Sequence, residues 1–437
     1  MKTLIHNARI VNEGRQFKGA VLIEDDRIAE VFEGDSCIFN FQNSIDAEGA
    51  ILLPGVIDTH VHFREPGMTH KADIQHESRA ALAGGVTSII DMPNVNPPTT
   101  TMERWQERMT LGARESRVNY AYYLGATNDF SGFKYQVPIP IKLFMGSSTG
   151  NMLVDKREAL LRVFQFAAQN NLLIVAHCED TPRINERMQE AKQLWGEDPS
   201  VEHHPWIRDE EACYRSSALA AEMARETGAQ LHLAHITTAR ELDLLGGNVT
   251  GEVCVPHLLF CDEYYSTLGT RIKCNPAIKS RKDRDALRLA LADGKLQTVG
   301  TDHAPHLLSE KEGGCAHAVS GMPMVQFSLV SMLGLADEGI ISIERMVDAM
   351  CHQPATRFGI TERGFIRPGY KADLVLVKPE TWTLQTNDIQ SKCGWSPLEG
   401  HTFHWRVQQT FLNGCLAYDK GNIHDDLRGE PLNFERK

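Results

Sequence analysis

A regular alternation of short apolar runs and helical stretches between residues 54 and 302 constrains the fold of this chain more than any other feature. Strands that alternate with helices are typical of a parallel sheet covered by helices. Eight such runs favour a closed (β/α)8 barrel of the TIM type within the α/β class, and a doubly wound open sheet is the structural alternative. The runs are Val56–His60, Thr87–Asp91, Asn119–Leu124, Ile141–Phe144, Leu172–His177, Gln230–His235, Gly251–Val255 and Gln297–Asp302, separated by helical segments such as His76–Ala83, Met102–Glu115, Lys156–Asn170 and Arg281–Asp293.

The two ends of the chain follow a different pattern, with strand-like segments separated by turns. They occur in residues 1–53 and return after about residue 365, as in Ala372–Val377 and Trp405–Asn413. A chain of 437 residues is long enough for a barrel and a smaller domain. We therefore expect residues 54–365 to form the barrel, and residues 1–53 and 366–437 to form one small β-sandwich.

Composition excludes several classes of partner. The formal net charge of −12 has the wrong sign for nucleic acid, which binds clustered Lys and Arg, so a small anionic substrate would need local positive charge. The apolar stretches are shorter than the ~20 residues of a membrane helix. The N-terminus lacks the apolar core of a secretory signal. Ten cysteines without a C-x-x-C pair indicate reduced thiols, so we expect a cytoplasmic protein.

Histidine and aspartate residues stand at the carboxyl ends of several predicted strands. His60 and His62 are two residues apart in VIDTHVH, so both side chains point to one face. His177, His235 and Asp302 each end a later run after apolar residues. Catalytic groups of (β/α)8 barrels gather at this face. Imidazole and carboxylate suit zinc and similar divalent ions, so the five residues are candidate metal ligands.

Lys142 lies in the fourth run, within IPIKLFMG. An ammonium group about 4 Å from a unit positive charge is repelled by roughly 4 kcal/mol at an effective dielectric of 20. A neutral lysine that reacts with CO2 would instead give an anionic carbamate able to bridge two metals. A lysine that extends to the barrel rim is the alternative interpretation.

Several motifs resemble the dihydroorotase family of the amidohydrolase superfamily, and the resemblance covers nearly the whole chain. It implies reversible hydrolysis of the cyclic amide of dihydroorotate to N-carbamoyl-L-aspartate, in pyrimidine biosynthesis. The most specific motifs are HFREPG and DMPN. The full group is HVHFREPG at 60–67, DMPN at 91–94, IKLF at 141–144, AHCE at 176–179, NPAIK at 275–279, TDHAPH at 301–306 and GFIRPGYKADLVLV at 364–377.

The resemblance implies two divalent metal ions, zinc by preference, with a hydroxide between them. It assigns one ion to His60, His62 and Asp302 and the other to His177 and His235, with carboxylated Lys142 as the bridge. Asp302 would act as general base and then as general acid.

The family pattern also bears on Asp155 and His257. Some family members use an aspartate in place of the carbamate, and Asp155 is the poorer candidate here because it opens a helical stretch. VPHLL at 255–259 contains one histidine where many relatives have two, so His257 is expected to be structural.

Substrate contacts are implied for Arg64, Asn94, Asn275 and His306. Arg64 suits a bidentate contact with a substrate carboxylate, Asn94 adds a hydrogen bond, and His306 completes the anchor. Gly146–Asn151 (GSSTGN) has the composition of a mobile flap, although an ordinary loop accounts for the same residues.

Two other functions remain as alternatives. Allantoinase and hydantoinase or dihydropyrimidinase share the fold and the ligands, but their substrates do not need the Arg64 and Asn94 anchor. A structural partner of aspartate carbamoyltransferase without activity belongs to another class, and the presence of every expected ligand argues against it. The sequence leaves open whether the chain forms a homo-oligomer or associates with that enzyme.

Overall fold

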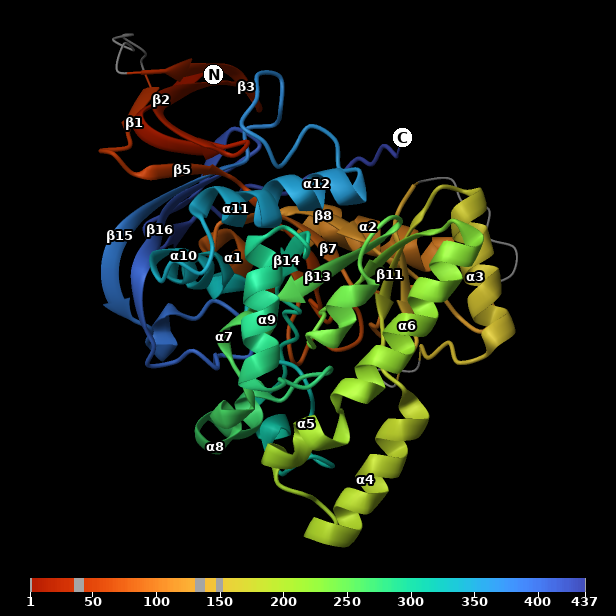
Figure 1. Ribbon diagram of the computed structural model, residues 1–437. Helices are drawn as coiled ribbons and strands as arrows, with labels where there is room; N and C mark the ends of the chain where they lie inside the picture. Colours follow the sequence, from red (N-terminus) through yellow and green to blue (C-terminus); the bar gives the residue numbers. More distant parts are fainter. Residues whose placement is uncertain (1, 35–42, 130–137, 147–151, 437) are drawn as a thin grey trace.

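The computed structural model describes residues 2–34, 43–129, 138–146 and 152–436. Parallel strands in the middle of the chain lie inside a layer of helices, and strands from the two ends lie together at one side (Figure 1). None of the helices in these ranges is long and apolar enough to cross a membrane. The nine described cysteines are free thiols and seven of them are buried.

The parallel strands occupy all eight predicted runs. They form a three-stranded sheet, β6-β7-β8, and a six-stranded sheet, β14-β13-β12-β11-β10-β9. Only Tyr123 separates β8 from β9, so the third run contributes to both sheets. The strands are β6 (Val56–Val61), β7 (Val86–Asp91), β8 (Asn119–Tyr122), β9 (Leu124–Gly125), β10 (Ile141–Phe144), β11 (Leu173–His177), β12 (Gln230–Leu233), β13 (Val249–Cys254) and β14 (Thr298–Gly300).

The first and last of these strands are neighbours, although no continuous ladder joins β14 to β6 in the described residues. A parallel bridge joins Val61 to His303, just beyond β14. The His62 N–H donates to the His303 carbonyl at 2.8 Å. The α/β class with a parallel sheet is therefore confirmed, whereas full closure of the barrel is not.

Helices connect the parallel strands, and the four predicted segments are among them. Side-chain caps fix several starts: Asp73 accepts from the His76 N–H and Ser280 from the Asp283 N–H. The helices are α1 (Ile74–Ala83), α2 (Met102–Glu115), α3 (Arg157–Gln169), α4 (Thr181–Trp195), α5 (His204–Ile207), α6 (Glu210–Thr227), α7 (Val255–Leu259), α8 (Tyr265–Leu268), α9 (Arg281–Ala292), α10 (Ser328–Asp337), α11 (Ile343–Val347) and α12 (Gln353–Phe358).

Both ends of the chain contribute to one nine-stranded sheet, in the order β18-β17-β16-β15-β5-β1-β2-β3, with β4 beside β1. The central strand β5 pairs with β1 on one side and with β15 on the other. The shared β-unit thus agrees with expectation, but its two-layer sandwich form is not confirmed. Its strands are β1 (Lys2–Asn12), β2 (Arg15–Glu24), β3 (Arg27–Glu33), β4 (Asn43–Asp46), β5 (Ile51–Pro54), β15 (Leu374–Thr383), β16 (Thr402–Leu412), β17 (Cys415–Asp419) and β18 (Asn422–Ile423).

The segment after β18 leaves this sheet and returns to the parallel strands. Isolated bridges join Pro431 to Tyr120 and Phe434 to Ile360. Leu432 is buried among residues of the parallel strands and α12. The last described residues therefore cover the end of the parallel sheet opposite the candidate site, which lies at the carboxyl ends of the strands.

Candidate functional site

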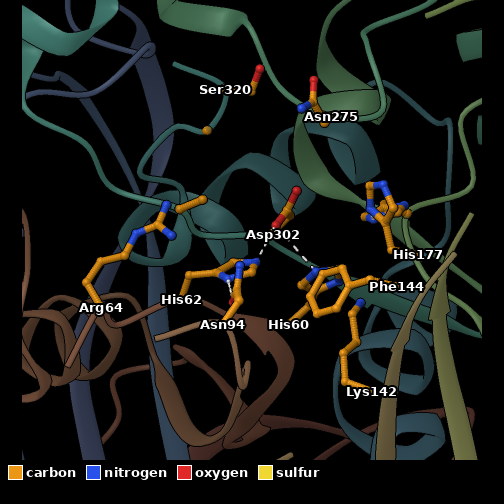
Figure 2. Close-up of a pocket in the computed structure, with 13 residues that line it drawn as sticks. His60, His62, Arg64, Asn94, Lys142, Phe144, His177, Asn275, Asp302 and Ser320 are labelled. Atoms are coloured by element: carbon orange, nitrogen blue, oxygen red, sulfur yellow. Dashed lines mark hydrogen bonds and ion pairs between the residues drawn. The ribbon is translucent and has the colours of Figure 1, made fainter. Parts of the chain in front are cut away.

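One cavity at the carboxyl ends of the parallel strands brings most of the predicted site residues together. In Figure 2, Arg64 lies on one side, Lys142 and His177 lie on the other, and Asp302 lies between them. Of the ten predicted site residues, His306 alone is not part of the lining. The lining consists of His60, His62, Arg64, Asn94, Lys142, Phe144, His177, His235, Asn275, Asp302, Ala304, Ser320 and Gly321.

His60, His62 and Asp302 form the first group of candidate ligands. The carboxylate Oδ1 of Asp302 lies 3.3 Å from Nε2 of His60 and 3.0 Å from Nε2 of His62. One ligand atom from each residue lies within 4.8 Å of the others. Asp302 has φ 48°, a left-handed conformation that turns the chain two residues beyond the end of β14. The three groups are thus spaced to hold one cation.

Burial and nearby charge act in opposite directions on Asp302. Burial alone would raise the pKa of this carboxyl, but the neighbouring His60 and His62 hold the pKa well below its usual range. Burial also lowers the pKa of His62 to about 4. Neutral imidazole and ionised carboxylate are the forms that bind a metal.

His177 and His235 form the second group. Nδ1 of His177 lies 2.8 Å from Nε2 of His235, and the two rings meet edge to face. Burial lowers the pKa of both histidines. His235 lies two residues beyond β12 with φ 36°, so a turn after the strand brings its ring toward His177. Two neutral imidazoles with facing nitrogens have lone pairs that a cation accepts readily.

Lys142 lies in the middle of β10 and its side chain is completely buried. Its Nζ has no hydrogen-bond partner in the described part of the chain, and it lies 5.2 Å from the centre of the Phe144 ring. Burial lowers the pKa of Lys142 to about 8. A buried, unpartnered amine is costly, so this position suits a lysine that is modified or that binds another group.

Three side chains orient the candidate ligands, and sequence reasoning missed two of them. Oε1 of Glu252 lies 2.6 Å from Nδ1 of His60 and also accepts from the His235 backbone N–H. Oε2 of Glu179 lies 3.1 Å from Nε2 of His177. Such partners fix ring orientation in metal sites. The sequence signal that could have identified Glu252 is a glutamate within an otherwise apolar predicted strand, GEVCV.

Asn94, the third orienting residue, also faces the cavity. Its Oδ1 lies 2.8 Å from Nδ1 of His62, where the imidazole N–H donates to the amide oxygen. The amide Nδ2 is then the group that can donate to a ligand. Asn275 lines the same cavity, and its buried Oδ1 has no hydrogen-bond partner within the described ranges.

Arg64 supplies positive charge to the cavity. It is 1% exposed and has φ 66°. Its Nε donates to the Pro305 carbonyl at 3.1 Å, and its Nη2 lies 2.9 Å from Nε2 of His306. Burial lowers the pKa of Arg64 to about 10, so the guanidinium stays charged near neutral pH. His306 therefore lies beside Arg64, outside the cavity lining.

Three further sequence predictions concern residues around this cavity. Asp155 accepts a hydrogen bond from Asn128 and does not line the cavity. His257 is buried, with Nε2 3.2 Å from the Pro276 carbonyl, as expected for a structural residue. Within the predicted flap, residues 147–151 lie outside the described residues.

Comparison with known proteins agrees with this arrangement. The chain matches the model of the amidohydrolase family over residues 51–126 and 151–416. It is similar to a dihydroorotase of Halobacterium salinarum, with 36% identity over 85% of this chain and 87% of that protein. It is also similar to an allantoinase of Bacillus velezensis, with 31% identity over 96% of this chain and 94% of that protein.

A similar solved structure is the L-hydantoinase (dihydropyrimidinase) of Arthrobacter aurescens. Its TM-score is 0.89 at 25% identity, and the match covers 96% of this chain and 97% of that one. The family match covers both groups of candidate ligands, the first of His60, His62 and Asp302 and the second of His177 and His235. On this agreement between sequence, structure and site, the chain belongs to the amidohydrolase family.

Proposed function

We propose that the protein is a dihydroorotase, which hydrolyses the cyclic amide of (S)-dihydroorotate reversibly to N-carbamoyl-L-aspartate in pyrimidine biosynthesis. The observation that carries this proposal is the buried guanidinium of Arg64 in the lining of the cavity that also contains the candidate ligands. A charged group buried at a binding site needs an anionic partner. The carboxylate of dihydroorotate supplies one beside the ring amide.

The residues in the cavity fit two divalent cations. His60, His62 and Asp302 would hold one, and the facing nitrogens of His177 and His235 would hold the other. Lys142, which is buried and whose Nζ has no hydrogen bond among the described residues, would bridge them as a carbamate. Nitrogen and carboxylate donors favour zinc. When bound, such ions acidify water and polarise the substrate carbonyl.

Asp302 would transfer the proton during hydrolysis. Its pKa lies well below the usual range, so the carboxylate is ionised and can accept a proton from the attacking water. The same carboxyl can then donate that proton to the departing ring nitrogen. His60 and His62 hold Oδ1 of Asp302, which leaves Oδ2 as the oxygen for proton transfer.

Arg64 and Asn94 would bind the substrate carboxylate at the side of the cavity away from Lys142. Arg64 donates from its guanidinium and Asn94 from its amide Nδ2. Asn275 would bind the ring through its amide, whose Oδ1 needs a donor. These contacts place the carboxylate and the amide at opposite ends of one small cavity.

The same observations support the finer architecture. We propose a closed (β/α)8 barrel over residues 54–365, supported by the bridge between Val61 and His303. Residues 1–53 and 366–437 would form the second domain, supported by the sheet that they share. Free buried thiols support a reducing compartment such as the cytoplasm.

Turnover of three rings tests the function directly. Purified protein loaded with zinc is assayed with dihydroorotate, allantoin and hydantoin at equal concentrations. We expect hydrolysis of dihydroorotate to dominate, with N-carbamoyl-L-aspartate as the product. A preference for allantoin or hydantoin would assign the chain to those amidohydrolases instead, and no turnover of any ring would favour the structural partner without activity.

A further inference from the structure

Lys71 has no role in the chemistry described above, yet it contacts the group that supports Arg64. Its ammonium lies 3.1 Å from Nδ1 of His306 and 2.6 Å from Oε1 of Glu310. Oε2 of Glu310 accepts the Leu307 N–H at 2.9 Å, which fixes that carboxylate. Only 13% of the Lys71 side chain is exposed. Lys71 is thus held in place against His306.

The His306 ring has a cationic donor at each nitrogen. Lys71 faces Nδ1, and Nη2 of Arg64 faces Nε2 at 2.9 Å. Burial and these two charges hold the pKa of His306 far below its usual range, so the ring is neutral. A neutral imidazole has one acceptor nitrogen and one N–H. One of the two contacts therefore places an N–H against another donor.

The surroundings of Nδ1 favour the tautomer in which Nδ1 accepts from Lys71. A lysine ammonium can only donate. Oε2 of Glu310 lies 3.6 Å from Nδ1, too far to accept an N–H from it. The Ser320 carbonyl also bonds the ring. Gly321, which follows Ser320, packs against Cδ2 of the His306 ring, the carbon bonded to Nε2. The N–H is therefore best satisfied at Nε2.

We propose that Lys71 is a positioning residue that fixes His306 as the Nε2–H tautomer, so that His306 and Arg64 both donate to the substrate carboxylate. Nη2 of Arg64 lies 2.9 Å from Nε2 of His306, so an Arg64 N–H faces the His306 Nε2–H and needs another acceptor. A carboxylate at Arg64 supplies that acceptor, once the guanidinium turns from the ring to the ligand. The inference rests on the proposed function, because it concerns a carboxylate-bearing substrate.

Three variants and two kinds of measurement test this role. Lys71→Met removes the ammonium, Lys71→Arg restores a cationic donor, and Lys282→Met on an exposed face of α9 is the matched control. The first measurement determines KM and kcat/KM for dihydroorotate and for hydantoin, which lacks a carboxylate, and compares the change in each substrate's constants between variant and wild type. The second records the ring tautomer in histidine-labelled protein by 15N NMR, with the His306 signal assigned by its loss in His306→Gln.

We expect Lys71→Met to raise the KM for dihydroorotate about tenfold, the loss of roughly one charge-assisted hydrogen bond. Hydantoin turnover should change by less than about twofold, since a ring without a carboxylate does not use this anchor. The His306 signal should move from Nε2–H toward Nδ1–H. Lys71→Arg should recover most of the affinity, and Lys282→Met should match the wild type.

Equal losses for dihydroorotate and hydantoin in Lys71→Met would overturn the proposal, because they would indicate a structural lysine. Wild-type protein with His306 as Nδ1–H would also overturn it, whether or not Lys71→Met folds. The NMR measurement does not depend on turnover. Suppose that the wild-type protein does not hydrolyse dihydroorotate but has His306 as the Nε2–H tautomer. This result would refute the proposed substrate, and the positioning of His306 by Lys71 would still hold.

Discussion

Replacing Arg64 by methionine tests the substrate anchor while leaving every candidate metal ligand in place. Methionine retains much of the length and apolar volume of the arginine side chain but has no charge and no donor. Arg64 contacts the Pro305 carbonyl and His306, and neither is a candidate ligand. The variant should therefore keep its metal content and lose affinity for an anionic substrate.

The size of the loss follows from the burial of Arg64 and from its neighbours. Truncating one partner of a buried, hydrogen-bonded charge pair costs about 2 to 5 kcal/mol. Arg64 is 1% exposed, so little water replaces it. Asn94 still donates to the carboxylate, which favours the lower part of that range. A loss of about 2 to 3 kcal/mol corresponds to a decrease in kcat/KM for dihydroorotate of about 30- to 150-fold.

The assay compares dihydroorotate and hydantoin on wild type, Arg64→Met and a surface control, Arg104→Met. Arg104 pairs with Glu107 on exposed positions of α2, so its loss should have no effect on either substrate. The hydantoin rate of Arg64→Met should fall by less than about threefold. A decrease of equal size for both substrates would refute the reasoning, since Arg64 would then support the fold and not the carboxylate.

Three further predictions follow from the site and its surroundings. Elemental analysis should find close to two divalent ions per chain and chelation should abolish turnover, so a metal-free preparation with full activity would contradict the ligand assignment. Lys142→Ala should lose nearly all activity with little change in the unfolding free energy, because the Nζ has no hydrogen bond to the described part of the chain. Short carboxylic acids should restore part of the rate, and wild-type turnover with both metals bound would exclude the bridge. Burial lowers the pKa of Lys311 to about 7 and that of Lys273 to about 8, so the unfolded chain binds more protons above pH 7. The unfolding free energy should therefore rise between pH 7 and 8.5, by at most about 1.4 kcal/mol per pH unit for each lysine, as denaturant titrations can measure. Lys311→Met should reduce that slope, and an unchanged slope would contradict this assignment.

The parallel strands and the candidate ligands at their carboxyl ends were predictable because the signals are local. Apolar residues precede His177 directly in the sequence, and the carboxyl ends of parallel strands share one edge of the sheet. His235 and Asp302 were placed at strand ends, but the structure has them two residues beyond β12 and β14. Their left-handed φ values explain the difference, since a turn that directs one side chain has no apolar pattern.

The supporting contacts were not predictable because they join distant parts of the chain. Glu252 meets His60 across 192 positions, and Lys71 meets His306 across 235. No spacing rule connects such pairs. His306 lies beside Arg64 and outside the cavity lining, so its part in the substrate anchor stays a prediction.

The sheet built from both ends of the chain has a consequence for synthesis on the ribosome. β5 pairs with β1 as soon as both have emerged, but its other edge pairs with β15, which begins at Leu374. At a translation rate of about 5 to 20 residues per second, that edge of β5 remains unpaired for tens of seconds while the parallel-strand region is translated. An open apolar strand edge is a site of aggregation. Chains that terminate before Leu374 would expose Ile51–Pro54 permanently, so they should be found with chaperones or in the insoluble fraction.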